Sequence, residues 1–160
     1  VLFLPYMMGE RSPHNDTDAR SVFIGMRPST TRAEMGLAVM EGVSFGLRDI
    51  LDRAGVRVDR ARICGGGARS ALWRRITASA LGVTLETVAT EKGPAYGAAL
   101  LAMTGCGEYN SLKEACDACV RVTDEILPDD ELKARYDELY KVYAGLYPAL
   151  RQTFRNMRGI

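Results

Sequence analysis

The sequence has few of the residues that build metal centres and disulfide frameworks. It contains one histidine, His14, and four cysteines, of which only Cys116 and Cys119 have the spacing of a redox or zinc-binding pair. No second cysteine pair accompanies them, so this motif carries little weight. We interpret the cysteines as structural residues in a reducing cytosol and predict no metal site in the chain.

The sequence also lacks an excess of charge of one sign and a long apolar run. Its 21 Lys and Arg residues and 20 Asp and Glu residues give a formal net charge of +1, so no global field attracts nucleic acid or an anionic membrane. No apolar run approaches the ~20 residues that span a bilayer, and no signal peptide is visible. We expect a cytoplasmic protein with neither nucleic acid nor a membrane as partner.

What the sequence does have is the composition of one folded domain, which we assign to residues 1–160. The chain is 47% hydrophobic, enough to bury a core. Charged residues form two local clusters, which we interpret as solvated faces. The basic cluster consists of Arg57, Arg60, Arg62, Arg69, Arg74 and Arg75. The acidic cluster consists of Asp124, Glu125, Asp129, Asp130 and Glu131.

Periodic patterns predict helices near both ends of the chain. A short strand is expected at Ser21–Ile24, followed by a long amphipathic helix that begins with a Thr31 and Glu34 capping box and stops at Gly55. A second long helix is expected from about Asp129. Because Pro148 removes one of its backbone hydrogen bonds, we expect a kink near Gly145.

Strand and helix patterns alternate in the middle of the chain. We predict a strand at Ala61–Cys64, a helix at Ser70–Leu81, a strand at Val83–Ala89 and a helix at Ala95–Thr104. The last helix is almost entirely small or apolar, so we expect it to be buried. The alternation predicts an α/β layer whose parallel strands are joined by a right-handed crossover.

The most informative local feature is the glycine run Gly65–Ala68, between a predicted strand and a predicted helix. Bare backbone lets a flat group approach without meeting a Cβ atom, and the helix beyond offers free N–H groups. The run lacks the Gly-Lys-Ser/Thr end of a Walker loop, and a dinucleotide fingerprint would need glycine at Arg69 or Ser70. From the residues alone, a nucleotide-sized binding site and simple packing of a strand-to-helix turn both stay open.

Several motifs in register carry a family resemblance. They are Pro5–Arg20, which contains Gly-Glu-Arg-Ser-Pro-His, Gly25–Glu34, Glu41–Gly42, the Gly-Gly-Gly-Ala-Arg-Ser-Ala-Leu-Trp segment Gly65–Trp73, and Glu91–Ala102. In this order they resemble the carboxy-terminal domain of the FGGY carbohydrate kinases, and the residues of these motifs are most similar to those of the xylulokinase branch. The resemblance covers almost the whole chain.

The resemblance implies an α/β fold of the actin-like (ribonuclease H-like) ATPase type, with a mixed sheet flanked by helices and ATP in a cleft between two domains. It implies that Gly66, Gly67 and Ala68 approach the adenosine. Related kinases often place an asparagine after this turn to contact adenine. Ser70 is the nearest substitute in this sequence.

The implied activity is phosphoryl transfer from ATP, with Mg²⁺, to a sugar hydroxyl, with D-xylulose giving D-xylulose 5-phosphate. The implied partners are a ketopentose, the amino-terminal domain of the same chain and, as an open alternative, a second copy in a homodimer. The family's catalytic aspartate belongs to the amino-terminal domain, which we expect to lie outside this chain together with the first strands of the carboxy-terminal domain. No catalytic residue is therefore assigned here, and the chain alone is expected to be inactive.

The polar segment after Gly9 holds the remaining candidates. We expect Asp16 and Asp18 to serve in turns or caps. Arg11 either faces the interdomain cleft or pairs with a nearby carboxylate, and we interpret His14 as a surface turn residue. Glu10 has no assigned role.

Two other kinds of function stay open at the level of sequence. Another FGGY kinase could act on gluconate, ribulose, fuculose or glycerol, because substrate choice resides mostly in the amino-terminal domain. An actin-like module could also bind a nucleotide without turnover, although the Gly-Glu-Arg-Ser-Pro-His loop argues against it.

Overall fold

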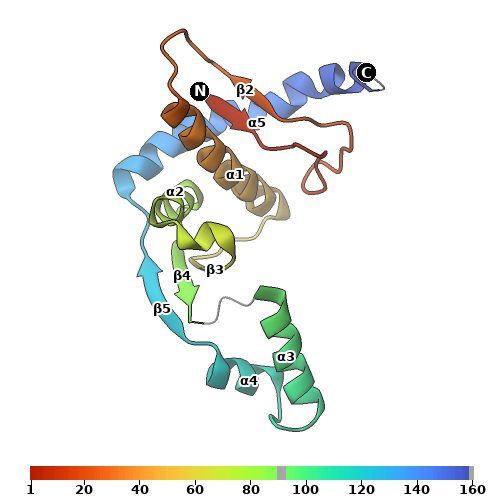
Figure 1. Ribbon diagram of the computed structural model, residues 1–160, viewed down its shortest axis with the longest axis vertical. Coiled ribbons are helices and arrows are strands. Elements are labelled where there is room, and N and C mark those ends of the chain that lie inside the picture. Colours follow the sequence, from red (N-terminus) through yellow and green to blue (C-terminus); the bar gives the residue numbers. More distant parts are fainter. Residues whose placement is uncertain (90–92, 159–160) are drawn as a thin grey trace.

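The computed structural model describes residues 1–89 and 93–158 of the chain (Figure 1). Strands and helices alternate through the middle of the molecule, between two long helices. In chain order the elements are β1 (Leu2–Leu4), β2 (Val22–Ile24), α1 (Arg32–Ala54), β3 (Arg60–Ile63), the 3₁₀ helix η1 (Gly66–Arg69), α2 (Ala71–Leu81), β4 (Thr84–Val88), α3 (Gly93–Gly105), α4 (Leu112–Cys119), β5 (Val122–Ile126) and α5 (Asp130–Asn156).

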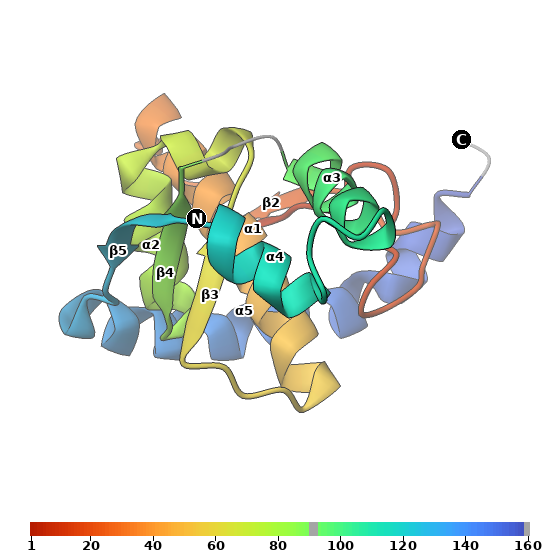
Figure 2. The ribbon, with the colours of Figure 1, turned by 90° about the horizontal axis from the view of Figure 1, so that it is seen from below.

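The strands form two small sheets. In the larger sheet, with the order β3-β4-β5, β3 and β4 run parallel with α2 between them in the chain, whereas β5 is antiparallel to β4 (Figure 2). Strands β1 and β2 form a separate antiparallel pair. The predicted α/β class and the mixed sheet flanked by helices are confirmed.

Helix α1 begins and ends as its sequence predicts. Thr31 accepts a hydrogen bond from the backbone N–H of Glu34 at 3.2 Å, and the Glu34 carboxylate accepts one from the Thr31 N–H at 2.7 Å. Gly55 closes the helix in a left-handed conformation. In mid-helix, a Cβ atom at Gly42 would lie 2.1 Å from the carbonyl oxygen of Phe3, so α1 packs directly on the backbone of β1.

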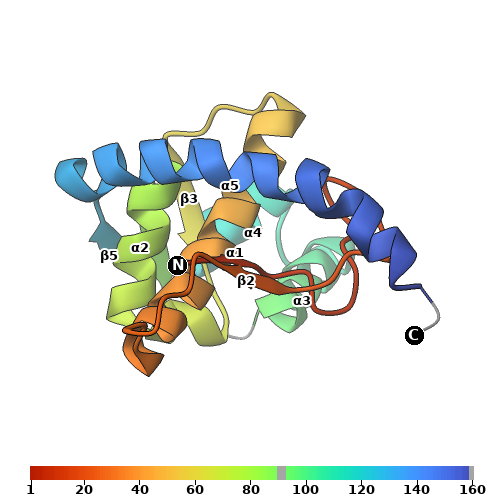
Figure 3. The ribbon, with the colours of Figure 1, turned by 90° about the horizontal axis from the view of Figure 1, so that it is seen from above.

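The main core lies between α1, α2, β1 and α5 and is rich in aromatic side chains. Tyr136 and Tyr143 of α5 contact Phe45 of α1 with ring centroids 5.4 and 5.3 Å apart. Leu4, Ile76 and Phe154 complete its buried centre. Figure 3 shows α5 along one side of the molecule, turning away from its first direction in the carboxy-terminal part that contains Pro148, where the sequence predicts a kink.

Helix α3 corrects one expectation. Its apolar composition predicted burial, but only Leu100 is buried and Leu101 is 59% exposed. The physical reason is its position: α3 packs mainly on the short helix α4, at the end of the molecule away from α1 and α5 (Figure 1). Apolar composition indicates that a helix needs a partner but does not identify that partner.

The two charged clusters pair with each other. Arg60 lies 3.0 Å from Glu86 and 2.6 Å from Glu125 across the three-stranded sheet, and Arg75 pairs with Asp129 at 2.5 Å. They are solvated, as predicted, and also bridge neighbouring elements. Within the described ranges, no helix has both the length and the apolar character needed to cross a bilayer.

Candidate functional site

The glycine run forms a tight turn between β3 and α2. Gly65 has φ 88° and ψ −170°, a conformation that glycine alone adopts readily. After it, the Ala68 N–H donates to the Gly65 carbonyl at 3.1 Å, and the Ser70 N–H donates to the Gly67 carbonyl at 3.2 Å. The backbone of η1 is therefore fixed by its own hydrogen bonds.

The neighbouring glycines Gly66 and Gly67 have different surroundings. Among the described residues, a Cβ atom built at Gly66 would meet no heavy atom within 4 Å, whereas one at Gly67 would lie 3.0 Å from Cζ3 and 3.1 Å from Cε3 of Trp73. Gly66 is exposed and Gly67 half-buried. The open face of the turn is thus at Gly66, while the Trp73 ring covers the side of Gly67 where a side chain would project.

The other two predicted binding residues have structural contacts. Ala68 is 3% exposed, so its methyl group belongs to the interior. The Ser70 hydroxyl caps α2 by accepting the Trp73 N–H at 3.2 Å, and the Ser70 carbonyl accepts the Arg74 N–H at 3.0 Å. A contact from Ser70 to a ligand would therefore use the remaining hydroxyl proton, and one from Ala68 would use its backbone.

The turn occupies a favourable place in the sheet. Parallel strands β3 and β4 end at the same edge, at Ile63 and Val88, and the turn follows the first of them. Open α/β sheets commonly bind ligands at this edge. In the first turn of α2, Ser70 accepts the Trp73 and Arg74 N–H groups, and the positive end of the helix dipole there favours negative charge.

The second glycine element is described only in part. Glu91 and Lys92 lie outside the described residues, and Gly93 begins α3 with φ 52°. From there α3 packs on α4, and the Tyr96 hydroxyl donates to the Cys119 carbonyl at 2.8 Å. All four cysteines are free. Among the described residues, no three His, Cys, Asp or Glu side chains are grouped so that they could hold a metal ion.

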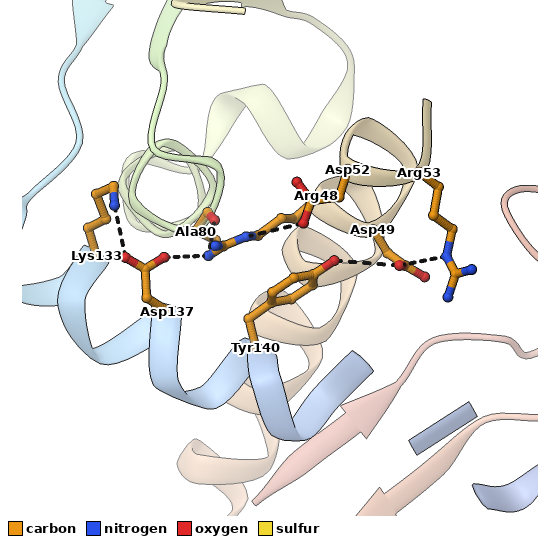
Figure 4. A network of polar contacts seen from close by, with 8 residues as sticks. All are labelled: Arg48, Asp49, Asp52, Arg53, Ala80, Lys133, Asp137 and Tyr140. Atoms are coloured by element: carbon orange, nitrogen blue, oxygen red, sulfur yellow. Dashed lines mark hydrogen bonds and ion pairs between the residues drawn. The ribbon is translucent and has the colours of Figure 1, made fainter. Parts of the chain in front are cut away.

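His14 is not a surface turn residue, and that interpretation is wrong. Its side chain is 6% exposed and stacks on Tyr147 with ring centroids 3.7 Å apart. Its Nε2 atom lies 3.2 Å from the Asp49 carboxylate, which also accepts hydrogen bonds from Arg53 at 2.8 Å and Tyr140 at 3.5 Å (Figure 4). Burial lowers the pKa of His14 and outweighs the opposite effect of Asp49.

The acidic residues of the same segment hold the loop in place. Glu10 accepts the backbone N–H of His14 at 2.7 Å. Asp16 accepts the Asp18 N–H at 2.9 Å and the Tyr147 hydroxyl at 2.7 Å, and the latter bond lowers the pKa of Asp16. The turn role predicted for Asp16 is confirmed, whereas the Asp18 carboxylate accepts a hydrogen bond from Arg158 at 3.0 Å.

Arg11 differs from its neighbours. Its side chain is exposed, and within the described ranges it makes no hydrogen bond or ion pair. The expectation that it pairs with a nearby carboxylate is therefore not met. A tightly held loop presents this guanidinium to the outside of the domain.

Sequence reasoning missed Trp73 and Asp49. Trp73 is the only tryptophan of the chain and lies three residues after the Ser70 cap, but nothing local shows that its ring folds back on Gly67. Asp49 lies between Arg48 and Ile50 in the predicted helix, and nothing in the local pattern marks it as a buried residue.

Comparison with known proteins gives one consistent result. The family model described as "FGGY family of carbohydrate kinases, C-terminal domain" matches residues 1–106. A xylulose kinase of Staphylococcus epidermidis is 35% identical over 155 residues, which are 95% of this chain and 31% of the relative.

Comparison with solved structures indicates the same family as the sequence comparisons. A ligand-bound xylulose kinase of Lactobacillus acidophilus has a TM-score of 0.88 at 26% identity, and a gluconate kinase of the same species has 0.87 at 26%. Each match covers 98% of this chain and 32% of the other chain. The chain thus spans about a third of the length of the relatives it matches. On these matches, the chain belongs to the FGGY family of carbohydrate kinases, and it contains that family's carboxy-terminal domain.

Proposed function

We propose that this chain supplies the adenosine side of the ATP site in a sugar kinase, and that the complete kinase phosphorylates a hydroxyl of D-xylulose. Family membership supports the kinase, and the relatives named xylulose kinase support the sugar. The single observation that carries the nucleotide site is the exposed backbone of Gly66, at the edge where β3 and β4 end.

The turn fits one part of the nucleotide. Bare backbone at Gly66 suits the flat face of a nucleoside, with Gly67 and Ala68 contributing main-chain atoms and Ser70 a hydroxyl proton. For Mg²⁺, the described residues offer no cluster of three ligands, so we assign to this chain the nucleoside and not the metal. MgATP would supply the phosphoryl group, and the base that accepts the sugar proton is proposed to belong to the amino-terminal domain.

Arg11 is the other candidate contact. We propose that it faces the cleft between the two domains, because the loop that carries it is held by His14 and Asp16 while its own guanidinium has no partner in the described ranges. Such a group is placed to contact a bound anion or the opposite domain when the cleft closes.

Gluconate is the second candidate substrate, since a gluconate kinase is among the similar structures. The test is ATP-dependent phosphorylation by the complete kinase across D-xylulose, gluconate, ribulose, fuculose and glycerol. We expect the highest kcat/KM for D-xylulose. A higher kcat/KM for another of these compounds would make that compound the assigned substrate. ATP binding without phosphoryl transfer to any of them would favour a module that only binds the nucleotide. The 160-residue chain alone is expected to transfer no phosphate.

A further inference from the structure

Trp73 is placed to control the shape of the glycine turn. Its ring fills the space beside Gly67, where an ideal Cβ atom would lie 3.0 Å from Cζ3 and 3.1 Å from Cε3. Real Cβ atoms seldom have such close neighbours, so a side chain at residue 67 would require the ring to shift by a few tenths of an ångström. The absence of a side chain at Gly67 thus allows the Trp73 ring to pack closely against the backbone, whether or not a ligand is bound.

Trp73 is also tied to the turn through its main chain. Its N–H donates to the Ser70 hydroxyl at 3.2 Å, and the Ser70 N–H donates to the Gly67 carbonyl at 3.2 Å. The ring therefore supports Gly67 from one side while this chain of hydrogen bonds holds it from the other. Both contacts restrict the same segment, whose next residue on the open side is Gly66.

We infer that Trp73 is a positioning residue of the nucleotide site: by bracing Gly67 it holds the backbone of Gly66 in the form that receives the nucleoside. This inference rests on the proposed function. Because Trp73 acts on the adenosine side, losing its ring weakens ATP binding and leaves sugar binding unchanged. A merely structural tryptophan would lower stability and leave both Michaelis constants as they are.

The first test compares Trp73→Ala with Leu72→Ala in the complete kinase. Leu72 is the preceding residue of α2 and is 55% exposed, and the three atoms nearest to a Cβ atom at Gly67 all belong to Trp73. We expect Trp73→Ala to raise KM for ATP about tenfold with KM for the sugar unchanged, and Leu72→Ala to change neither. Equal KM values for ATP in wild type and Trp73→Ala would overturn the inference. If the alanine variant does not fold, Trp73→Phe serves instead: a rise of about threefold supports the inference and no rise overturns it.

A double-mutant cycle with Gly67→Ala separates bracing from direct contact. With Trp73 present, the new methyl group meets the ring, and we expect KM for ATP to rise about tenfold. In the Trp73→Ala background the space is vacant, so Gly67→Ala should add less than about twofold. An equal rise in both backgrounds would mean that the added methyl group meets the nucleotide directly and does not act through the Trp73 ring, which would overturn the inference.

The failure of this inference can be told apart from the failure of the proposed function. Gly66→Val reports on the site more directly, because no heavy atom of the described residues lies within 4 Å of a Cβ atom at this position. If Gly66→Val raises KM for ATP and Trp73→Ala does not, only the bracing role is lost. If neither changes KM for ATP, the nucleotide binds elsewhere and both proposals fall.

Discussion

The glycine turn and the His14 loop are both irregular segments, but they differ in how their groups are satisfied. At the turn, Gly66 leaves backbone open with no side chain nearby. In the loop, His14 and Asp16 are held by Asp49 and Tyr147. A segment that leaves space is available to a ligand, whereas side chains that are buried and partnered act as a support. His14 and Asp16 thus serve structure, whereas Arg11 of the same loop has no partner in the described ranges, and the glycines form the proposed site.

The largest effect should come from breaking the support of the loop. Asp49→Asn removes a buried carboxylate charge that lies against Arg53 and His14. We expect a loss of about 3 kcal/mol in the free energy of unfolding, measured by urea denaturation, with KM for ATP unchanged. The matched control is Asp52→Asn on the same helix, where the side chain is 56% exposed, and its cost should stay within about 0.5 kcal/mol. Equal costs would show that burial of Asp49 has no role.

Gly66→Val should raise KM for ATP and leave stability nearly unchanged, which is the reverse of the effect of Asp49→Asn. A Cβ atom at residue 66 has no described heavy atom within 4 Å and lies on the open face, so we expect KM for ATP to rise about thirtyfold, which corresponds to about 2 kcal/mol of binding, with little change in unfolding. Gly36→Val in α1, which also has nothing within 4 Å, is the control and should leave KM for ATP unchanged. An unaffected KM at Gly66 would remove the distinction between the two segments.

Tyr147→Phe should give a smaller effect that depends on pH. It removes the hydroxyl that donates to Asp16 at 2.7 Å, and we expect a loss of about 1 kcal/mol at pH 6. The same bond lowers the pKa of Asp16 from its usual 3.8. Its stabilising contribution is therefore complete above that pKa and is lost as the pH falls through the lower pKa of the folded state. Urea denaturation at pH 6 and at pH 3 should show the difference between variant and wild type shrinking in acid, and a constant difference would contradict this account.

The smallest effect on stability is expected at Arg11. Since its side chain is exposed and has no partner in the described part of the chain, Arg11→Ala should change the free energy of unfolding by less than about 0.5 kcal/mol. If it faces the cleft, kcat/KM of the complete kinase should fall about fivefold or more. Unchanged kinetics with a loss of stability would place Arg11 among the supporting residues of the loop.

The sequence allowed the local features of this domain to be predicted. The capping box of Thr31 and Glu34, the left-handed end at Gly55 and the parallel strands around the turn were found in the structure, because each depends on residues close in the chain. Contacts between distant residues could not be predicted. His14 contacts Asp49, which lies 35 positions later in the chain. This contact depends on how the loop packs against α1, and no local sequence pattern encodes that packing. The exposure of α3 was missed for the same reason.

The open backbone of the glycine run was predicted from the sequence, but the difference between its glycines was not. The run from Gly65 to Ala68 was identified as a place of open backbone, but that Gly66 is open and Gly67 covered depends on the rotamer of Trp73. Sequence alone treats the two glycines as equivalent. Only the packing of a side chain six residues further on distinguishes them.

The most direct measurement is the structure of the complete kinase with a non-hydrolysable ATP analogue. The account predicts nucleoside atoms in van der Waals contact with the backbone of Gly66, at roughly 3.5–4.0 Å, and Trp73 still packed against Gly67. A nucleotide bound away from this turn, with Gly66 covered by side chains of the other domain, would contradict it.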